Sequence, residues 1–282
     1  MTVTLDKLFQ DKALVDWFRN FDSCLVAFSG GVDSAVLAGA AVQALGDRAL
    51  AVCAESPSSR TTDHAATVAL AEEIGIRLQF VTSREFDDPA YTANSPDRCY
   101  HCKRIRMKAI VDLAAELDLA VVVEGSQADD MHDVRPGRRA VVELGIRSPL
   151  VELGFNKEQV RDIARSLGLS IHAKPADPCL STRLAYGVPL TDERLRRIEQ
   201  AEQFLRPLGF TPLRVRMHDD EHVRIEVSEE QIDEIVLLRK PILERFGQLG
   251  FRFVSVDLEG FRSGKMNAVP DRSVASDDAH AK

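Results

Sequence analysis

Short apolar runs alternate with longer helix-like stretches in the first part of the chain. The apolar runs, which predict buried strands, lie at 23–28, 49–54, 77–81 and 120–124. The longer stretches, which have helical periodicity or an Ala- and Leu-rich composition, lie at 6–20, 34–46, 63–74, 105–117 and 156–167. Strands that alternate with helices in this way predict βαβ units and therefore a parallel sheet.

The pattern changes after a proline-containing stretch at 172–189, which has no clear periodicity and which we interpret as a linker or a functional loop. Beyond it, the pattern predicts a helix at 191–205 and strands at 213–217 and 223–227. A second helix is predicted to begin at 228 and to break at Pro241, and a last strand is predicted at 251–258. We therefore predict an α/β domain over 1–175, a smaller α+β domain over 176–270, and a disordered tail over 271–282.

Composition limits the class of protein. The 282 residues include 36 Lys and Arg against 44 Asp and Glu, a net charge of −8, and 45% of them are hydrophobic, which allows a sizeable core. The acidic balance disfavours nucleic acid as a partner. Five cysteines exclude a fully paired disulfide framework. Neither a signal peptide nor a membrane-spanning run is visible, so we predict a cytoplasmic protein with reduced thiols.

The strongest local motif is Ser-Gly-Gly-Val-Asp-Ser, which lies between a predicted strand and a predicted helix. Gly30 and Gly31 allow backbone N–H groups to approach an anion, and the helix N-terminus adds a favourable dipole. Ser29 and Ser34 can donate hydrogen bonds to phosphate oxygens. Asp33 makes sense beside phosphates if Mg²⁺ bridges them. The motif lacks the lysine of a Walker P-loop and the spacing of a dinucleotide-binding loop.

This loop resembles the PP-loop of the ATP pyrophosphatases, which split ATP to AMP and pyrophosphate while they adenylate a substrate carbonyl. The resemblance implies an adenine nucleotide alpha-hydrolase-like fold with a parallel sheet, and ATP bound at the loop.

The five cysteines fall into two groups. Cys24 and Cys53 lie inside predicted strands, and we interpret them as core residues. Cys99 and Cys102 lie among cationic residues just before a predicted helix, which is expected to favour their thiolates. Cys179 lies in the proline-containing loop, where no apolar residue is required. Spacing alone leaves a redox dithiol, a zinc site and an iron–sulfur site open.

Taken in order, six segments resemble the LarE family of ATP-dependent sulfur-inserting enzymes, which serve the nickel-pincer cofactor of lactate racemase. They are SGGVDS, RCYHCK, EGSQADDMHDVRPG, PCLSTRLAYG, the Arg214-Val215-Arg216 strand and GFRSGKMN. The resemblance implies that ATP adenylates a carboxylate of pyridinium-3,5-biscarboxylic acid mononucleotide, after which sulfur forms a thiocarboxylate. It also implies a homo-oligomer, which we expect to be a hexamer.

The resemblance assigns roles to individual residues. ATP and Mg²⁺ would be held by Ser29, Gly30, Gly31, Asp33, Ser34, Gly125 and Asp129. Cys179 matches the reactive cysteine, and Ser181 and Arg183 would orient phosphate or carboxylate groups. The residues that match positions around the substrate phosphate are Arg214, Arg216, Asp257 and Arg262. An exposed strand face for the two strand arginines and a helix cap for Asp129 remain alternatives.

Cys99 and Cys102 resemble the branch of the family in which three cysteines, here with Cys179, hold a 4Fe–4S cluster that carries the transferred sulfide. Single-cysteine members instead sacrifice the residue equivalent to Cys179. A tRNA 2-thiolation enzyme of the same superfamily is the alternative function, although a pI near 5.5 disfavours it. A nucleotide sensor with structural zinc is a third possibility, and the sulfide donor is not visible in the sequence.

Overall fold

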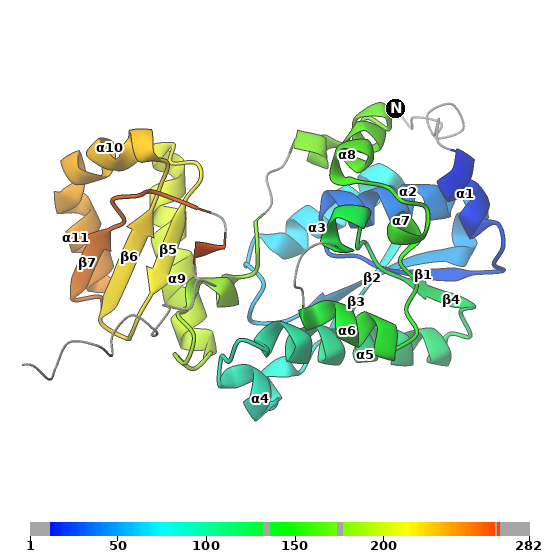
Figure 1. Cartoon of the computed structure of the whole chain (residues 1–282), viewed down its shortest axis with the longest axis horizontal. Coiled ribbons are helices and arrows are strands. Elements are labelled where there is room, and N and C mark those ends of the chain that lie inside the picture. The colour runs from blue at the N-terminus through cyan, green and yellow to red at the C-terminus, as the bar shows by residue number, and fades with distance from the viewer. Residues whose placement is uncertain (1–11, 132–135, 174–176, 263, 266–282) are drawn as a thin grey trace, which may run out of the picture. The chain divides into compact units, whose positions relative to one another are not determined.

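The structure, a computed structural model, describes residues 12–131, 136–173, 177–262 and 264–265. Its larger sheet has four parallel strands in the order β3-β2-β1-β4 (Figure 1). The strands are β1 (Cys24–Ala27), β2 (Ala49–Glu55), β3 (Arg77–Thr82) and β4 (Val121–Val123). The predicted parallel sheet is therefore confirmed.

Helices cover both faces of this sheet (Figure 1). One face packs against α1 (Lys12–Phe18), α2 (Val32–Leu45), α3 (Asp63–Ile74), α7 (Pro149–Glu152) and α8 (Lys157–Ser166). The other face packs against α5 (Arg98–Glu116) and α6 (Pro136–Glu143), and the short α4 (Pro89–Thr92) precedes α5. The arrangement is the doubly wound α/β fold that alternating strands and helices predict.

The apolar run of β1 is explained by its central position in the sheet, where both of its faces are buried. Cys24 and Val26 point into the core beneath α2, whereas Leu25 and Ala27 point into the core beneath α5. A strand that is buried on both faces has no polar positions. Because β2 pairs with β1 on one side and β4 pairs with it on the other, the strand order reverses at β1. Ligands of such sheets bind outside the carboxyl ends of the strands at this point.

The second sheet has three strands in the order β5-β6-β7, namely β5 (Arg214–Met217), β6 (His222–Glu226) and β7 (Phe253–Val256). The pair β5 and β6 is antiparallel, and β6 and β7 are parallel. Its helices are α9 (Asp192–Leu205), α10 (Ile232–Leu237) and α11 (Arg239–Gln248). The helical stretch breaks at Leu238 rather than at Pro241, because proline is tolerated in the first turn of α11.

The chain divides into two compact units. Unit 1 comprises Met1–Cys179 and Pro189–Asp192, and unit 2 comprises Leu180–Val188 and Glu193–Lys282. The larger sheet lies in unit 1 and the smaller sheet lies in unit 2. The domain limits of 175/176 and 270/271 stay predictions, and the predicted tail at 271–282 lies outside the described residues.

The sequence pattern missed the start of α5. This helix begins at Arg98 and not near 105, so Cys99 and Cys102 lie in its first two turns. Charged residues and histidine dominate the start of the helix, and they obscure the apolar periodicity on which the prediction depended. The short helices α4, α6 and α7 were also not predicted.

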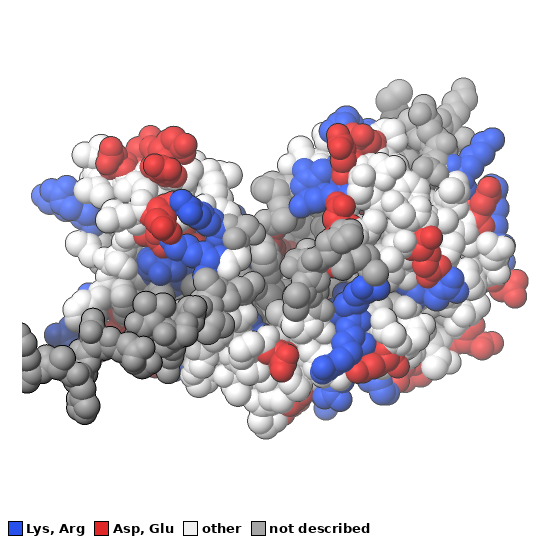
Figure 2. Space-filling model, viewed as in Figure 1, with Lys and Arg blue, Asp and Glu red and all other residues white. Residues whose placement is uncertain are grey.

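Basic and acidic side chains are interspersed on the visible face of each unit (Figure 2). Among the described residues, no helix is both long enough and apolar enough to cross a membrane.

Candidate active site

The loop after β1 has the backbone geometry that its glycines predict. Gly30 has a φ of +69°, in the left-handed region, and a Cβ at this position would lie 2.9 Å from Thr67 Oγ1. Gly31 is the N-cap of α2 and has no side-chain cap within the described part of the chain. The N-terminus of a 14-residue helix that follows a strand in this way is suited to an anion.

The hydroxyl groups of the loop are bonded to one another. Ser29 Oγ and Ser34 Oγ lie 3.3 Å apart, Ser34 Oγ donates to Gly31 O at 3.0 Å, and Gly31 N donates to Ser29 Oγ at 3.4 Å. Ser34 is buried, whereas Ser29 is exposed and Asp33 is partly buried. The loop is therefore preorganised around its glycines, with Ser29 at its surface.

Gly125, which lies after the neighbouring strand β4, packs against the loop that follows β1. It follows the carboxyl end of β4, and a Cβ built on it would lie 3.1 Å from both Asp33 Cβ and Ser34 N. A side chain here would require the backbone of the β1 loop to shift, so the close approach favours glycine. The predicted nucleotide residues of the β1 and β4 loops are thus in direct contact.

Glu124, just before Gly125, anchors this second loop. Its carboxylate accepts hydrogen bonds from Lys103 Nζ at 2.9 Å, Ser148 Oγ at 2.6 Å and Ser126 N at 3.1 Å. Burial raises the pKa of Glu124, but the Lys103 charge and the hydrogen bonds outweigh burial and hold the pKa below its ordinary value. Glu124 was not among the predicted site residues, although it ends the predicted apolar run 120–124, where a buried carboxylate needs a partner.

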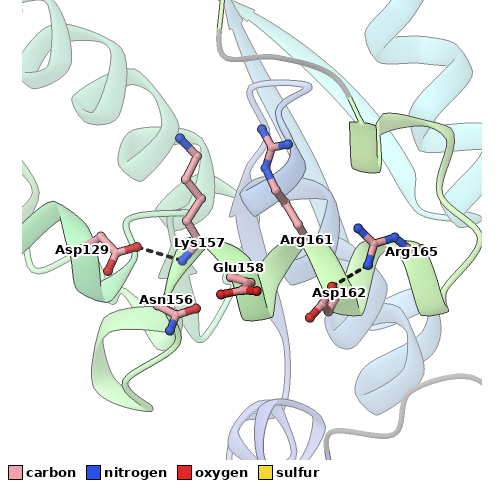
Figure 3. A pocket seen from close by; sticks show the side chains of 7 residues that line it. All are labelled: Asp129, Asn156, Lys157, Glu158, Arg161, Asp162 and Arg165. Atoms are coloured by element: carbon pink, nitrogen blue, oxygen red, sulfur yellow. Dashed lines mark hydrogen bonds and ion pairs between the residues drawn. The ribbon is translucent and has the colours of Figure 1, made fainter. Parts of the chain in front are cut away.

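Asp129 borders an open depression of about 560 Å³ along α8 (Figure 3). Its Oδ2 accepts a hydrogen bond from Lys157 N at 3.0 Å. Lys157 and Arg161, one helical turn apart, extend from α8 in the same direction (Figure 3). Asp162 instead pairs with Arg165 at 2.5 Å. Lys157 and Arg161 are site candidates that sequence reasoning missed, and their spacing of four residues on a predicted helix was the available signal.

The structure brings Cys99, Cys102 and Cys179 close enough within unit 1 to interact electrostatically. None of the five cysteines forms a disulfide. Among the described residues, no three His, Cys, Asp or Glu side chains are arranged to hold a metal ion as they stand. Cys24 is buried in the core, as predicted, whereas Cys53 is only partly buried.

The expectation that Cys99 and Cys102 are thiolates is wrong for the structure as it stands. Burial raises the pKa of Cys102 to about 12 and outweighs the nearby Arg106 charge. Loss of solvation also raises the pKa of Cys99, although part of its surface is exposed. The pKa of each thiol is therefore shifted away from the thiolate, and a bound metal ion would favour the ionised form.

Arg106 lies on the same helix, one turn after Cys102, and interacts electrostatically with Cys102 and Cys179. Burial lowers the pKa of Arg106, but interactions with neighbouring acidic groups more than offset this and raise it above its ordinary value. In order of effect, these groups are Cys102, Glu85, Cys179 and Cys53. Arg106 also donates hydrogen bonds to Ala54 O and to Ser59 Oγ. Arg106 places a positive charge near Cys102, Cys179 and Cys53, and no periodic signal in the sequence reveals it.

Cys179 is the residue at which the chain leaves unit 1. On its N-terminal side, Arg60 donates hydrogen bonds to Asp177 Oδ1 at 2.8 Å and to Pro178 O at 3.2 Å. On its C-terminal side, Ser181 and Arg183 lie in a buried 3-10 turn of unit 2.

Arg183 lies inside unit 2 and has no exposed surface. Its Nε donates to Glu202 Oε1 at 2.9 Å, and Val215 N donates to the same oxygen at 3.2 Å. Burial raises the pKa of Glu202, but the Arg183 charge and hydrogen bonds more than offset this and lower it overall. The pair therefore fixes the turn against α9 and β5.

Arg214 and Arg216 lie on one face of the smaller sheet and are nearly buried. Arg216 Nε pairs with Glu226 Oε2 at 3.0 Å, and its Nη1 donates to Thr182 O at 2.8 Å. Arg214 lies with its guanidinium carbon 5.0 Å from the centre of the Phe261 ring. These two arginines thus do not form the exposed strand face that was the alternative.

Asp257 is ion-paired with Lys265 Nζ at 2.6 Å and with Arg224 Nε at 3.2 Å. Burial raises its pKa, but these cations and hydrogen bonds more than offset this and lower it overall. Arg262 is exposed nearby in the chain. Arg224 also pairs with Glu226 Oε1 at 2.9 Å. One network within unit 2 therefore joins Arg216, Glu226, Arg224, Asp257 and Lys265.

A doubly wound parallel sheet with a Ser-Gly-Gly-x-Asp-Ser loop at its switch point defines an ATP-binding protein of the PP-loop ATP pyrophosphatase class. A sequence profile of the NAD synthase family matches residues 14–132, which include this loop. The chain is also 26% identical over 206 residues to one of the subunits of the glutamine-hydrolysing GMP synthase of Thermococcus kodakarensis, covering 67% of this chain and 66% of that protein.

More extensive similarity defines the family. The chain is 38% identical over 255 residues to the pyridinium-3,5-bisthiocarboxylic acid mononucleotide synthase of Lactiplantibacillus plantarum, covering 90% of this chain and 92% of that enzyme. It is 42% identical over 258 residues to an uncharacterised protein of Synechocystis, covering 91% and 96% of the two chains. The chain belongs to the LarE family of ATP-dependent sulfurtransferases.

Proposed function

We propose that this enzyme inserts sulfur into pyridinium-3,5-biscarboxylic acid mononucleotide, the precursor of the nickel-pincer cofactor, at the expense of ATP. The observation that carries the proposal is that unit 1 contains both a preorganised PP-loop and Cys179 beside two further cysteines. The similarity to the synthase of Lactiplantibacillus plantarum supports the choice of substrate.

The reaction requires two displacements. A carboxylate oxygen of the substrate attacks the α-phosphorus of ATP, and the bond to pyrophosphate breaks. Sulfur then attacks the carbonyl carbon of the acyl-adenylate, and AMP leaves with the electron pair of the broken C–O bond. The first step is needed because AMP is a far better leaving group than the oxide of a free carboxylate.

The nucleotide would be bound where the β1 and β4 loops meet. In this proposal Ser29, Ser34 and the backbone of Gly30 and Gly31 hold the phosphates, and Asp33 binds Mg²⁺ that bridges to them. Gly125 allows the close approach of the two loops. Asp129, Lys157 and Arg161 add polar and cationic groups along α8 for the phosphate chain.

Gly125→Val is expected to lower ATP-dependent pyrophosphate release by at least about 100-fold, because the branched side chain displaces Asp33 and Ser34 from the positions they occupy. Pyrophosphate release during the first turnover measures this effect. Gly247→Val is the matched control, since a Cβ at Gly247 meets no atom within 4 Å. A Gly125→Val enzyme with the wild-type rate contradicts this nucleotide site.

The substrate phosphate would be bound by the sheet face of unit 2 that carries Arg214, Arg216 and Asp257, together with Arg262. The guanidinium groups of Arg214, Arg216 and Arg262 support this proposal, because a planar guanidinium can donate two parallel hydrogen bonds to phosphate oxygens. We propose that Ser181 contacts the substrate and that Arg183 acts by holding the turn, because its guanidinium is enclosed and paired with Glu202.

We propose that Cys99, Cys102 and Cys179 hold a 4Fe–4S cluster. The donor set fits, because three thiols lie near enough to interact electrostatically and Arg106 would offset part of the charge of Cys102 and Cys179 in their ionised forms. When bound, the cluster would supply a sulfide on its fourth iron as the sulfur to be transferred. The residues must approach more closely to do so, since their present arrangement does not form a metal site among the described residues.

The test is anaerobic incubation of iron- and sulfide-reconstituted protein with ATP, Mg²⁺ and the pyridinium dicarboxylate nucleotide, followed by mass spectrometry of protein and product. We expect thiolated product, pyrophosphate, several iron atoms per chain and an unchanged protein mass. Loss of one sulfur and its hydrogens from Cys179 indicates sacrifice instead, and colourless, iron-free protein rejects the cluster. The absence of thiolated product rejects the function, and thiolation of added tRNA favours the alternative.

The expected hexamer and cytoplasmic location stay predictions.

A further inference from the structure

Arg60 connects two segments of unit 1 that are far apart in sequence. It lies in the loop between β2 and α3, and its Nη2 atom donates to Asp177 Oδ1 at 2.8 Å and to Pro178 O at 3.2 Å. Its own backbone is fixed, because Arg60 N donates to Asp63 Oδ2 at 2.9 Å at the start of α3. A guanidinium held at a helix start thus binds the two residues that precede Cys179.

This ion pair is shielded from solvent. The side chains of Arg60 and Asp177 are 11% and 19% exposed, whereas those of the surface pair Arg19 and Asp16 are 60% and 58% exposed. Exposed pairs contribute little because water screens them and both side chains lose freedom. A shielded pair that also binds a backbone carbonyl fixes the chain more firmly, and its loss leaves an uncompensated charge.

The same loop also contacts the helix that carries the other two cysteines. Arg106, one turn after Cys102 on α5, donates to Ser59 Oγ at 3.4 Å and to Ala54 O. Ser59 and Arg60 are adjacent, so a single loop contacts both the α5 cysteine segment and the segment that leads to Cys179. The geometry therefore fixes Cys179 relative to unit 1 before the chain enters unit 2 at Leu180.

We propose that Arg60 is a positioning residue for sulfur transfer, and that its hydrogen bonds to Asp177 and Pro178 hold Cys179 where the activated substrate and the α5 cysteines can be reached. This rests on the proposed function. Arg60 touches neither ATP nor substrate in this proposal, so adenylation does not need it. Transfer does need it, because displacement of a reacting group by about 1 Å lowers rates by about 100-fold.

The test compares Arg60→Ala with Arg19→Ala, which removes an exposed Arg–Asp pair of the same kind. In Arg60→Ala, we expect thiolated product to form about 100-fold more slowly while first-turnover pyrophosphate release stays within about twofold of wild type. Arg60→Lys keeps the charge and one donor to Asp177 and is expected to recover part of the loss. Arg19→Ala is expected to match wild type in both measurements.

A second measurement is independent of turnover. Alkylation of Cys179 by iodoacetamide, followed by peptide mapping, is expected to accelerate about tenfold in Arg60→Ala, because the segment is released. A wild-type product rate in Arg60→Ala, or a parallel loss of pyrophosphate release and product, overturns the proposal. If wild-type enzyme forms no product, the proposed function fails, and the alkylation rates alone decide whether Arg60 holds Cys179. Asp177→Asn, which keeps a side-chain acceptor, serves if Arg60→Ala does not fold.

Discussion

Cys179→Ser is expected to reduce formation of thiolated product by at least about 1000-fold while pyrophosphate release in the first turnover stays within about threefold of wild type. A serine hydroxyl is not ionised near neutral pH and is a much weaker nucleophile than a thiol, so it cannot replace sulfur as the attacking atom. It is also a poor ligand for iron in place of a thiolate. Adenylation uses the PP-loop, which does not contain Cys179.

Variants of the two α5 cysteines separate the two sulfur sources. If Cys179 ligates a cluster, Cys99→Ser and Cys102→Ser lose iron and product formation as Cys179→Ser does. If Cys179 is sacrificed, the two α5 variants still convert one equivalent of substrate, and the wild-type protein loses mass. Cys24→Ala, at a buried core position on β1, is the control for removal of an unrelated thiol. Wild-type product formation by Cys179→Ser contradicts both sources.

Arg183→Ala is expected to lower the free energy of unfolding by about 3–5 kcal/mol, because it leaves the buried Glu202 carboxylate without its main partner. Urea denaturation, monitored through the secondary-structure signal of the whole chain, measures the change in the free energy of unfolding. The linear extrapolation must allow for separate transitions of the two units. Glu202→Gln is expected to be destabilising for the converse reason, since it leaves the Arg183 charge buried.

The control for this prediction is Arg194→Ala. Arg194 pairs with Asp220 at 2.6 Å, but the Asp220 side chain is 58% exposed, so the expected loss is below about 1 kcal/mol. The double variant Arg183→Met with Glu202→Leu is expected to recover part of the stability, because no unpaired charge remains. If Arg183→Ala keeps the wild-type stability and instead loses only product formation, Arg183 acts on the substrate directly.

Short sequence patterns predicted the features of the fold that depend on the burial and backbone freedom of neighbouring residues. The uniformly apolar run of β1 predicted a strand buried on both faces, and the two glycines after it predicted the tight turn before α2. These features follow from short-range burial and backbone freedom. They located the nucleotide-binding loop without any knowledge of the remaining fold.

Other features depend on contacts between distant segments and leave no periodic pattern. Arg60 and Asp177 are 117 positions apart, and neither lies in a motif. The protonation of Cys102 was also misjudged, because neighbouring cations are visible in sequence whereas the burial that outweighs them is not. Arg183 matched a family position, but its enclosure against Glu202 appears only once α9 is packed beside the turn.

The path of the chain between the units limits how the protein can be divided. The chain passes from one unit to the other three times, after Cys179, Val188 and Asp192. The short segment Pro189–Asp192 belongs to unit 1. Its Leu190 is almost completely buried, and Leu190 N donates a hydrogen bond to Thr92 O at 2.8 Å. A fragment that stops at Cys179 therefore lacks part of the unit it is meant to represent. Because unit 2 is not one contiguous segment, it cannot be exchanged between relatives as a single cassette.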